Sequence, residues 1–283
     1  MTAVTNYQKI ADLAVAALDW EVDFTPKPGL VDAISNGAHQ DMDAALFHRS
    51  AASLHDYFVQ LGAVAEGRAP NDLLREQIGS LGRTAEKRMF AATNGVNTHK
   101  GAIWALGLLV TAYWLQPAAN SAQLLAIAGQ LARIDDPGNE SVTKQTYGQQ
   151  AQHQYGIGGA QAEAQSNFPH IARLLELPLT TKDDWLRALL TLYATVDDTN
   201  VIHRSDLATL RFLQQQAKRI AQASEPVLKN SEFAGLADFT IEKNISPGGS
   251  ADLFAATKFL KTLPKQDLAE RSVLDYGKIT FQL

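Results

Sequence analysis

The 283-residue sequence contains no cysteine, and this absence excludes disulfide bonds, thiolate metal sites and a cysteine nucleophile. Long apolar runs are also missing, because the longest, around residues 103–115, is shorter than the roughly 18 to 20 residues of a bilayer span. Residues 1–6 lack the basic and apolar segments of a secretory signal. The net charge of -5 comes without any basic block. We therefore expect a cytoplasmic protein whose partners include neither a membrane nor a nucleic acid.

Apolar residues, which make up 46% of the sequence, follow a helical period almost throughout. Ile10, Ala14 and Leu18 belong to one such stripe, whereas alternation typical of a strand is found only at residues 278–281. With no repeat and no long linker, the sequence predicts an all-α fold made of a single domain, residues 1–283. Helices are predicted at residues 6–22, 41–64, 71–92, 99–115, 121–134, 141–164, 168–176, 182–197, 205–223 and 250–262. Thr181, with Asp184 three residues later, predicts a capping box at the start of the helix 182–197.

Residues 94–101 carry polar and flexible side chains directly ahead of the most apolar segment, residues 102–115. A helix that is apolar on every side must be buried, so we predict a central helix at about 99–115. Its N-terminus would present unpaired backbone N–H groups and a partial positive charge to an interior cleft, an arrangement that attracts phosphates. The alternative is a capped core helix with a basic residue beside its cap. The candidate residues here are Asn97, Thr98, His99 and Lys100.

Four other stretches are polar or rich in glycine, and most of them lie where a loop meets a predicted helix. In residues 25–32, two prolines stiffen the chain around Lys27, so its ammonium group is expected to be displayed from a loop, either solvated or against a phosphate. Residues 155–160 predict close helix packing or a bend rather than a phosphate loop. Residues 244–252 lead into a helix that begins near Ser250 and Asp252, another helix start suited to an anion.

The fourth stretch, residues 36–43, contains Asp41 and Asp43 in the first turn of the predicted helix 41–64, where carboxylates complement the helix dipole. At helical spacing Asp41 shares a stripe with His48 and His55, and such a row could instead hold a divalent cation or supply a general base. Glu86 lies about two helical turns before the 94–101 stretch and is either solvated or directed at the same cleft.

Carboxylates also occur in residues 197–200, at the end of the predicted helix 182–197. This is the unfavourable pole of the helix dipole for a negative charge. The placement therefore favours a functional use of these side chains.

Together these segments resemble the triphosphoribosyl-dephospho-coenzyme A synthase family, in the family's order over residues 21–260. The resemblance rests on residues 21, 26–32, 37–39, 41–43, 86, 95–103, 155–156, 158–160, 163–164, 198–200, 203–204 and 246–253. Residues 103–109, 134–136 and 168–171 are similar to its malonate decarboxylase branch. The chain departs from the family pattern at Asn94 and Asn167, where glycine is expected, and at residues 205–206, which replace a glycine pair. Asparagine tolerates left-handed backbone, so the turn at Asn94 is expected to survive.

The resemblance implies an all-helical transferase that displaces adenine from ATP with the ribose 2′-hydroxyl of 3′-dephospho-coenzyme A. Its product, 2′-(5″-triphosphoribosyl)-3′-dephospho-CoA, is the prosthetic-group precursor for the acyl-carrier subunit of malonate decarboxylase or citrate lyase. Breaking the N-glycosidic bond builds positive charge on the ribose, which requires carboxylates, and the triphosphate requires Mg²⁺ and cationic contacts. The sequence leaves the oligomeric state open, with a homodimer as one alternative.

On this basis three carboxylates, Asp41, Asp43 and Glu86, are assigned to metal binding or base catalysis. Phosphate contacts are assigned to Lys27, His99, Lys100 and Arg204, and substrate orientation to Asn97, Thr98, Ser250 and Asp252. Replacing Asp41 or Glu86 by alanine should abolish adenine release. Two other functions fit the same residues: a metal-dependent hydrolase of ADP-ribosyl-type N-glycosides, and a non-catalytic helical module that binds a nucleotide or a carrier protein.

Overall fold

The computed structural model describes residues 3–139 and 147–264, and the regular elements in those ranges are all helical, as predicted. None of the helices in these ranges is both long and apolar enough to cross a bilayer. The elements are α1 (Ala3–Asp23), α2 (Ala44–Ser53), α3 (His55–Ala65), α4 (Asp72–Ala92), α5 (Lys100–Leu115), α6 (Ser121–Arg133), η1 (Pro137–Asn139), α7 (Tyr147–Tyr155), α8 (Gly159–Gln165), α9 (Pro169–Leu175), α10 (Lys182–Thr195), α11 (Thr199–Arg204), α12 (Leu207–Gln222), η2 (Val227–Lys229), α13 (Ser231–Glu242) and α14 (Gly248–Thr262).

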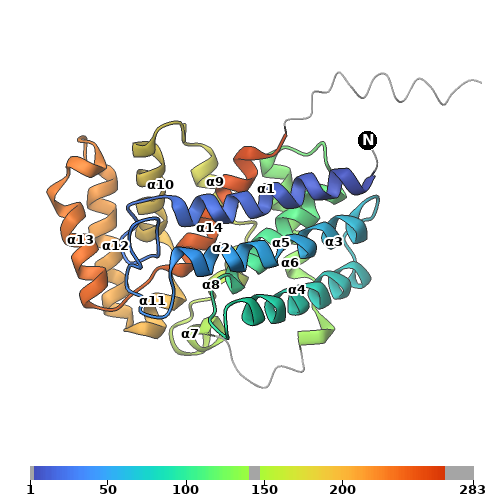
Figure 1. Ribbon diagram of the computed structural model, residues 1–283, viewed down its shortest axis with the longest axis horizontal. Helices are drawn as coiled ribbons and strands as arrows, with labels where there is room; N and C mark the ends of the chain where they lie inside the picture. Colours follow the sequence, from blue (N-terminus) through green and yellow to red (C-terminus); the bar gives the residue numbers. More distant parts are fainter. Residues whose placement is uncertain (1–2, 140–146, 265–283) are drawn as a thin grey trace, which may run out of the picture.

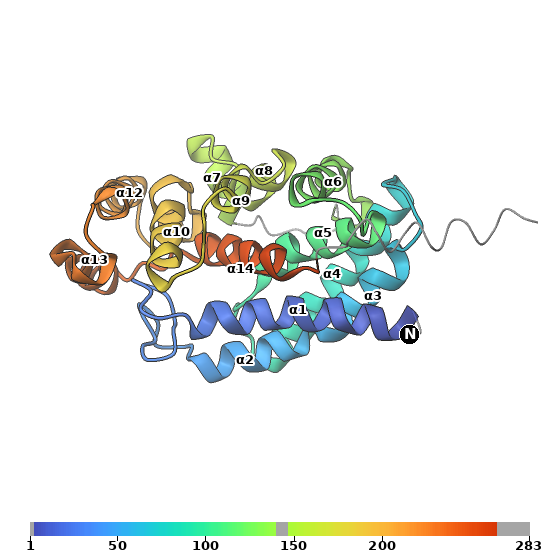
Figure 2. The same ribbon diagram turned by 90° about the horizontal axis from the view of Figure 1, so that it is seen from above.

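The helices form layers around α5 and α14, which lie in the middle of the molecule (Figures 1 and 2). On one side of this pair lie α1 and α2, and on the other lie α6, α7, α8 and α9 (Figure 2). At one end α10, α12 and α13 pack together. The first turns of α5 and α14 consequently open between layers rather than at the outer surface.

The burial of α5 confirms the predicted central helix. Residues from Ala102 to Trp114 are buried with the exception of Trp104, which is partly exposed. Gly107 allows a close approach of α3, because a Cβ at this position would lie 2.1 Å from the hydroxyl oxygen of Tyr57. That hydroxyl donates to the carbonyl of Ile103 at 3.2 Å. The first turn of α5 is therefore held firmly in position.

Two helices that were predicted to be continuous are each divided in the structure. The predicted helix 41–64 is divided at Leu54, whose N–H bonds the carbonyl of Ala51 at 3.0 Å in a tightened turn that no proline or glycine announces. The predicted helix 141–164 is interrupted after α7, where Gly156 adopts a left-handed φ of 73°. This gives the bend predicted for residues 155–160, whereas residues 141–146 lie outside the described ranges.

Two further boundaries differ from the prediction. The predicted helix 205–223 is α12 alone, and the short helix α11 precedes it. Helix α13, which packs through Phe233 and Leu236, was not among the predicted helices. The strand-like residues 278–281 lie outside the described ranges.

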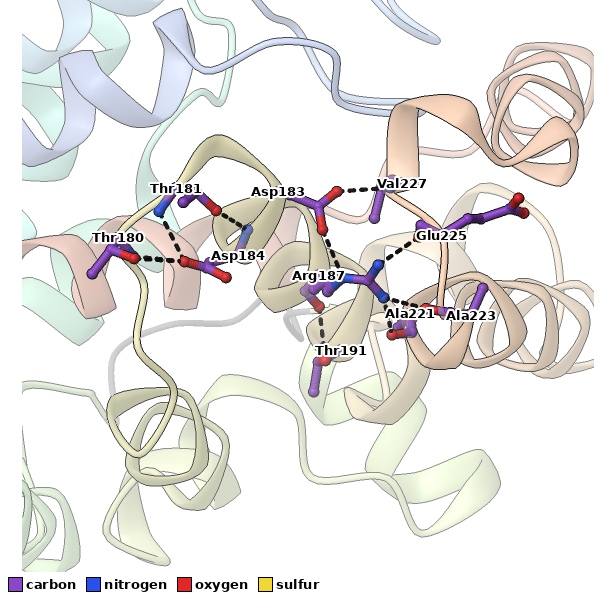
Figure 3. A network of polar contacts seen from close by, with 10 residues as sticks. All are labelled: Thr180, Thr181, Asp183, Asp184, Arg187, Thr191, Ala221, Ala223, Glu225 and Val227. Atoms are coloured by element: carbon purple, nitrogen blue, oxygen red, sulfur yellow. Dashed lines mark hydrogen bonds and ion pairs between the residues drawn. The ribbon is translucent and has the colours of Figure 1, made fainter.

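The N-terminus of α10 has the predicted capping box (Figure 3). The hydroxyl of Thr181 accepts the N–H of Asp184 at 3.1 Å, and the carboxylate of Asp184 accepts the N–H of Thr181 at 2.8 Å. Two helix N–H groups that lack intrahelical partners are thus satisfied locally. This start fixes the register of the helix that carries Arg187.

Candidate active site

A cavity of about 2000 Å³ opens between the layers, and its walls come from helices between α1 and α14. Residues from all five polar or glycine-rich stretches line it, although the stretches are far apart in sequence. A cavity for a single small ligand usually measures about 300–1,000 Å³. The volume is therefore large enough for two ligands of nucleotide size.

Asp198 is buried in the floor of this cavity, at the N-termini of two helices. It caps α11, accepting the N–H of Asn200 at 3.1 Å, and it also accepts the N–H of Ser250 at 2.9 Å at the start of α14. The expectation of carboxylates at an unfavourable helix pole is wrong here, because α10 ends at Thr195. Burial nevertheless raises the pKa of Asp198, and these hydrogen bonds oppose the shift.

The side chain of Ser250 contacts Asp198 and does not line the cavity. Its hydroxyl lies 3.3 Å from the carboxylate of Asp198, the side chain is buried, and the residue is not part of the cavity lining. Direct orientation of a substrate, the role assigned from the sequence, does not fit this placement. Ser250 instead holds a carboxylate that does face the cavity.

Asp252 points at the first turn of α5, the helix end expected to bind phosphate. A Cβ on Gly101 would lie 1.9 Å from Oδ2 of Asp252, so only glycine admits the carboxylate here. Its enclosed position raises the pKa of Asp252 well above the ordinary range, and repulsion by Asp198 and Glu21 adds to the shift, which the N–H of Ala102 opposes. The protein thus supplies its own acidic group at the helix end predicted to be free for a ligand.

The expectation that Lys27 is displayed from a loop is wrong. Its side chain is fully buried, and Nζ donates to both the carboxylate and the backbone carbonyl of Glu21. The backbone N–H of Lys27 is bound by Asp32 at 2.9 Å, so the loop is folded over the lysine. Glu21 lines the cavity, and burial raises its pKa in spite of Lys27.

His99 is buried at the N-terminus of α5 and is not a cationic phosphate contact. Burial is the main cause that lowers its pKa to about 3, and the positive charges of Lys27 and His48 add to it, so the ring is neutral. Its Nδ1 lies 2.8 Å from the hydroxyl of Ser50, which lies 2.6 Å from the hydroxyl of Thr98. Thr98 lines the cavity and ends this hydrogen-bonded row.

Asn97 and Lys100 occupy the turn before α5, and both line the cavity. The side-chain oxygen of Asn97 accepts the N–H of Lys100 at 3.2 Å, as expected for a residue that holds the turn. Nζ of Lys100 lies 3.0 Å from the carboxylate of Glu86, and both side chains are partly exposed. Glu86 therefore reaches the cavity, but paired with a cation.

The three carboxylates assigned to a metal do not converge. Asp43 caps α2 by accepting the N–H of Leu46 at 2.7 Å and is not part of the large cavity's lining, whereas Asp41 lies exposed on the rim, 3.4 Å from His39. Across residues 3–139 and 147–264, no three histidine or acidic side chains gather in a way that could hold a metal ion. The predicted row of Asp41 with two histidines is also absent, because His48 and His55 pair with aspartates of α1.

Arg204 lines the cavity but most of its guanidinium binds the protein. Nε donates to the carbonyl of Asn244 at 2.7 Å, and Nη2 donates to the carbonyl of Ala38 at 2.9 Å and to the side-chain oxygen of Asn244 at 2.7 Å. Residues 205–206, which replace the glycine pair of the family, fit the fold because Asp206 caps α12. Arg204 joins two cavity loops.

The other departures also fit the backbone. Asn94 has a φ of 53° and Asn167 a φ of 64°, both left-handed conformations that asparagine tolerates better than other non-glycine residues. The turn before α5 therefore keeps the geometry expected of a glycine.

The sequence did not indicate a role for several cavity residues. Glu163 lies 2.7 Å from Nδ1 of His170, which raises the pKa of that histidine. Arg75 is buried on α4 beside the cavity. These residues belong to amphipathic helices and have no local pattern of their own, and the one available signal was the family motif that contains Glu163.

The family model described as ATP:dephospho-CoA triphosphoribosyl transferase matches residues 7–271. A Pseudomonas putida protein named probable 2-(5''-triphosphoribosyl)-3'-dephosphocoenzyme-A synthase is 41% identical over 270 residues, which are 92% of this chain and 96% of that protein. Proteins of the same name from Azotobacter vinelandii and Pseudomonas syringae pv. syringae are 41% and 42% identical, over 90% of this chain and 91% of their own lengths. No solved structure matches the chain.

Proposed function

Because the chain belongs to the ATP:dephospho-CoA triphosphoribosyl transferase family, we propose that its cavity binds ATP and 3′-dephospho-CoA together and joins them. The ribose 2′-hydroxyl of dephospho-CoA attacks C1′ of the ATP ribose, the bond from C1′ to adenine breaks, and the hydroxyl proton is transferred to a base while adenine receives one. The single observation that carries this proposal is the convergence of all five polar stretches on one cavity of about 2000 Å³.

Three carboxylates on the cavity wall suit the chemistry at C1′. Positive charge develops on the ribose as the glycosidic bond breaks, and nearby carboxylates stabilise it. Glu21, Asp198 and Asp252 all line the cavity and influence one another electrostatically. They replace Asp41, Asp43 and Glu86 as the carboxylates that we place at the reacting carbon.

The surroundings of Asp252 and Asp198 favour different roles. Burial raises the pKa of both groups, but the carboxyl group of Asp252 accepts fewer N–H donors, which would stabilise its ionised form, than that of Asp198. Groups whose surroundings separate their pKa values divide into acid and base. Asp252 therefore donates a proton to departing adenine, and Asp198 faces the developing charge or accepts the proton of the 2′-hydroxyl.

Magnesium enters with the substrate as the MgATP complex. The described residues contain no cluster of three ligands, and Mg²⁺ commonly uses only one or two carboxylates besides the phosphates of its nucleotide. Glu86 and Asp41, which lie at the cavity, remain our candidates for such contacts. Asp43 is set aside because it caps α2.

The test is to incubate the protein with ATP and Mg²⁺, with and without 3′-dephospho-CoA, and to measure free adenine. Adenine that forms only with the acceptor supports the transferase. Adenine formed without the acceptor would identify the N-glycoside hydrolase, and no adenine would leave the non-catalytic binding module.

We further propose that the product serves the acyl-carrier subunit of malonate decarboxylase, in the cytoplasm. This rests on the similarity of residues 103–109, 134–136 and 168–171 to that branch. Genes of malonate decarboxylase beside this one would support the assignment, and genes of citrate lyase would contradict it. Whether the active protein is a homodimer is a matter for light scattering.

A further inference from the structure

Arg75 is a buried cation for which the described residues supply few hydrogen-bond acceptors. Its side chain is 7% exposed and lines the cavity. Of the five N–H donors of a guanidinium, the one described hydrogen bond runs from Nη1 to Oδ2 of Asp136, at a long 3.3 Å. Nε is buried without a partner among the described residues. Buried donors without partners are costly, so this arrangement suits a group that meets a ligand.

The partner of Arg75 is shared with a second arginine. Arg83 also contacts Oδ2 of Asp136, at a shorter 2.7 Å, and it is not part of the cavity lining. Asp136 lies close against α4 because residue 79 is glycine, whose Cβ would otherwise stand 2.0 Å from that oxygen. Two guanidinium groups therefore share one carboxylate, and the better bond belongs to the arginine outside the cavity.

Trp104 orients the guanidinium of Arg75. The Cζ atom of Arg75 lies 5.4 Å from the centre of the indole ring, within the range of a cation–π contact. The indole is itself fixed, because its Nε1 donates to the carbonyl of Ala160 at 3.2 Å. Both side chains line the cavity. The positive charge is thus held in place, and among the described residues its ion pair is with a carboxylate that Arg83 shares.

The other cations of the cavity are less free. In the described part of the chain, the lysine and arginine side chains that line it are Arg75, Lys100 and Arg204. Lys100 is paired with Glu86, and Arg204 is engaged by carbonyl oxygens. A polyphosphate that enters this largely acidic cavity therefore has its best fixed charge partner at Arg75.

We infer that Arg75, oriented by Trp104, is the main binding residue for the phosphate chain of a nucleotide substrate. This rests on the proposed function, which places two phosphate-bearing substrates in the cavity. Lys100 contributes beside it once the phosphate competes with Glu86. The phosphate subsite consequently lies on α4 and α5, in the same cavity as the carboxylates Asp198 and Asp252.

The experiment measures binding of inorganic tripolyphosphate to the full chain by calorimetry, which requires no turnover. Three variants are compared: Arg75→Gln, Arg75→Lys, and Arg83→Gln as the control that removes the other partner of Asp136. Thermal unfolding of each variant verifies that it is folded. We expect Arg75→Gln to weaken binding about 10- to 100-fold, as for the loss of a charged hydrogen bond. Arg75→Lys should weaken it less, and Arg83→Gln should leave it nearly unchanged.

No tripolyphosphate binding by the unsubstituted protein, undiminished binding by Arg75→Gln, or an equal loss in Arg83→Gln would overturn the inference. In the adenine-release assay, a rise in KM for ATP in Arg75→Gln identifies the triphosphate as the bound group, and a rise for dephospho-CoA alone identifies its diphosphate. Failure of the proposed function would instead appear as no adenine release by the unsubstituted protein, whatever it binds.

Discussion

Arg187 and Arg75 differ in how fully the protein uses their guanidinium groups. Every nitrogen of Arg187 that can donate has an acceptor at 2.6–2.9 Å (Figure 3). These acceptors are the carboxylate of Asp183 and the carbonyls of Ala221, Ala223 and Glu225. Arg75 has one long bond and a buried Nε without a described partner. The first arginine completes the packing of α10 against α12, whereas the second keeps N–H groups for which the described residues supply no acceptor.

The same contrast extends to the acidic groups. Asp183, beside Arg187, pairs with that arginine and also accepts the N–H of Val227 at 2.7 Å. Around the cavity, burial raises the pKa values of Glu21, Asp198 and Asp252, so their ionised forms are disfavoured there. Polar groups that hydrogen-bond to one another stabilise a fold. Acidic groups around a cavity whose pKa values are shifted by burial and by neighbouring charges instead indicate a functional site.

The largest expected effect is on activity, from Asp252→Asn. Loss of a general acid should reduce adenine release about 10²- to 10⁴-fold, with no loss of folded protein. Steady-state adenine release and thermal unfolding check this together. The control is Asp238→Asn, an exposed position on α13. Activity within a few-fold of the unsubstituted protein would remove Asp252 from the mechanism.

Arg187→Ala tests the other side of the comparison. The substitution leaves three backbone carbonyls without their donor, and we expect unfolding to become easier by about 2 to 3 kcal/mol. Adenine release below the unfolding transition should not change, because the residue is not part of the cavity lining. Chemical denaturation gives the free energy, with exposed Arg173→Ala as the control. A loss of activity without a loss of stability in Arg187→Ala would contradict the claim that Arg187 has a purely structural role.

Gly101→Ala should have a smaller effect on catalysis. The new methyl group would lie 1.9 Å from Oδ2 of Asp252, so the carboxyl group must move, and the rate should fall on the order of tenfold from misplacement. Gly235→Ala is the matched control, since a Cβ at that helical glycine meets nothing within 4 Å. Equal rates for both variants would mean that the position of Asp252 does not matter.

The smallest expected effect is the pH dependence of stability. Because the pKa of Asp252 is raised in the folded protein, the folded state keeps a proton that the unfolded chain releases above the ordinary carboxyl pKa. Stability therefore falls as pH rises from that value through the folded pKa. An asparagine side chain cannot ionise, so Asp252→Asn should gain stability relative to the unsubstituted protein from about pH 4 to pH 8. The measurement is the unfolding temperature of both proteins across this pH range. If Asp252→Asn instead lost stability relative to the unsubstituted protein as pH rises, the raised pKa of Asp252 would not be due to its burial.

The sequence predicted the features that depend on local pattern. The buried helix α5, the capping box at Thr181 and the left-handed backbone at Asn94 each follow from a few neighbouring residues. The break at Leu54 has no such signal and was missed.

Within the site, the five polar stretches were found because their composition differs from that of the helices. What each side chain does there depends on distant partners. Lys27 was predicted to lie on an exposed loop because nothing in the local sequence shows that it pairs with Glu21, a residue of the preceding helix. Asp252 looked ready for a ligand because Gly101, 151 positions earlier, gave no sign of its approach. Arg75 acquires significance only beside Asp136 and Trp104.

The most direct test of the account is the mass of the acceptor after reaction. The unsubstituted protein is incubated with ATP, Mg²⁺ and 3′-dephospho-CoA, and the CoA compound and free adenine are quantified from the same sample. We predict that dephospho-CoA gains one triphosphoribosyl group for each adenine released. Adenine release with dephospho-CoA unchanged in mass would contradict the account.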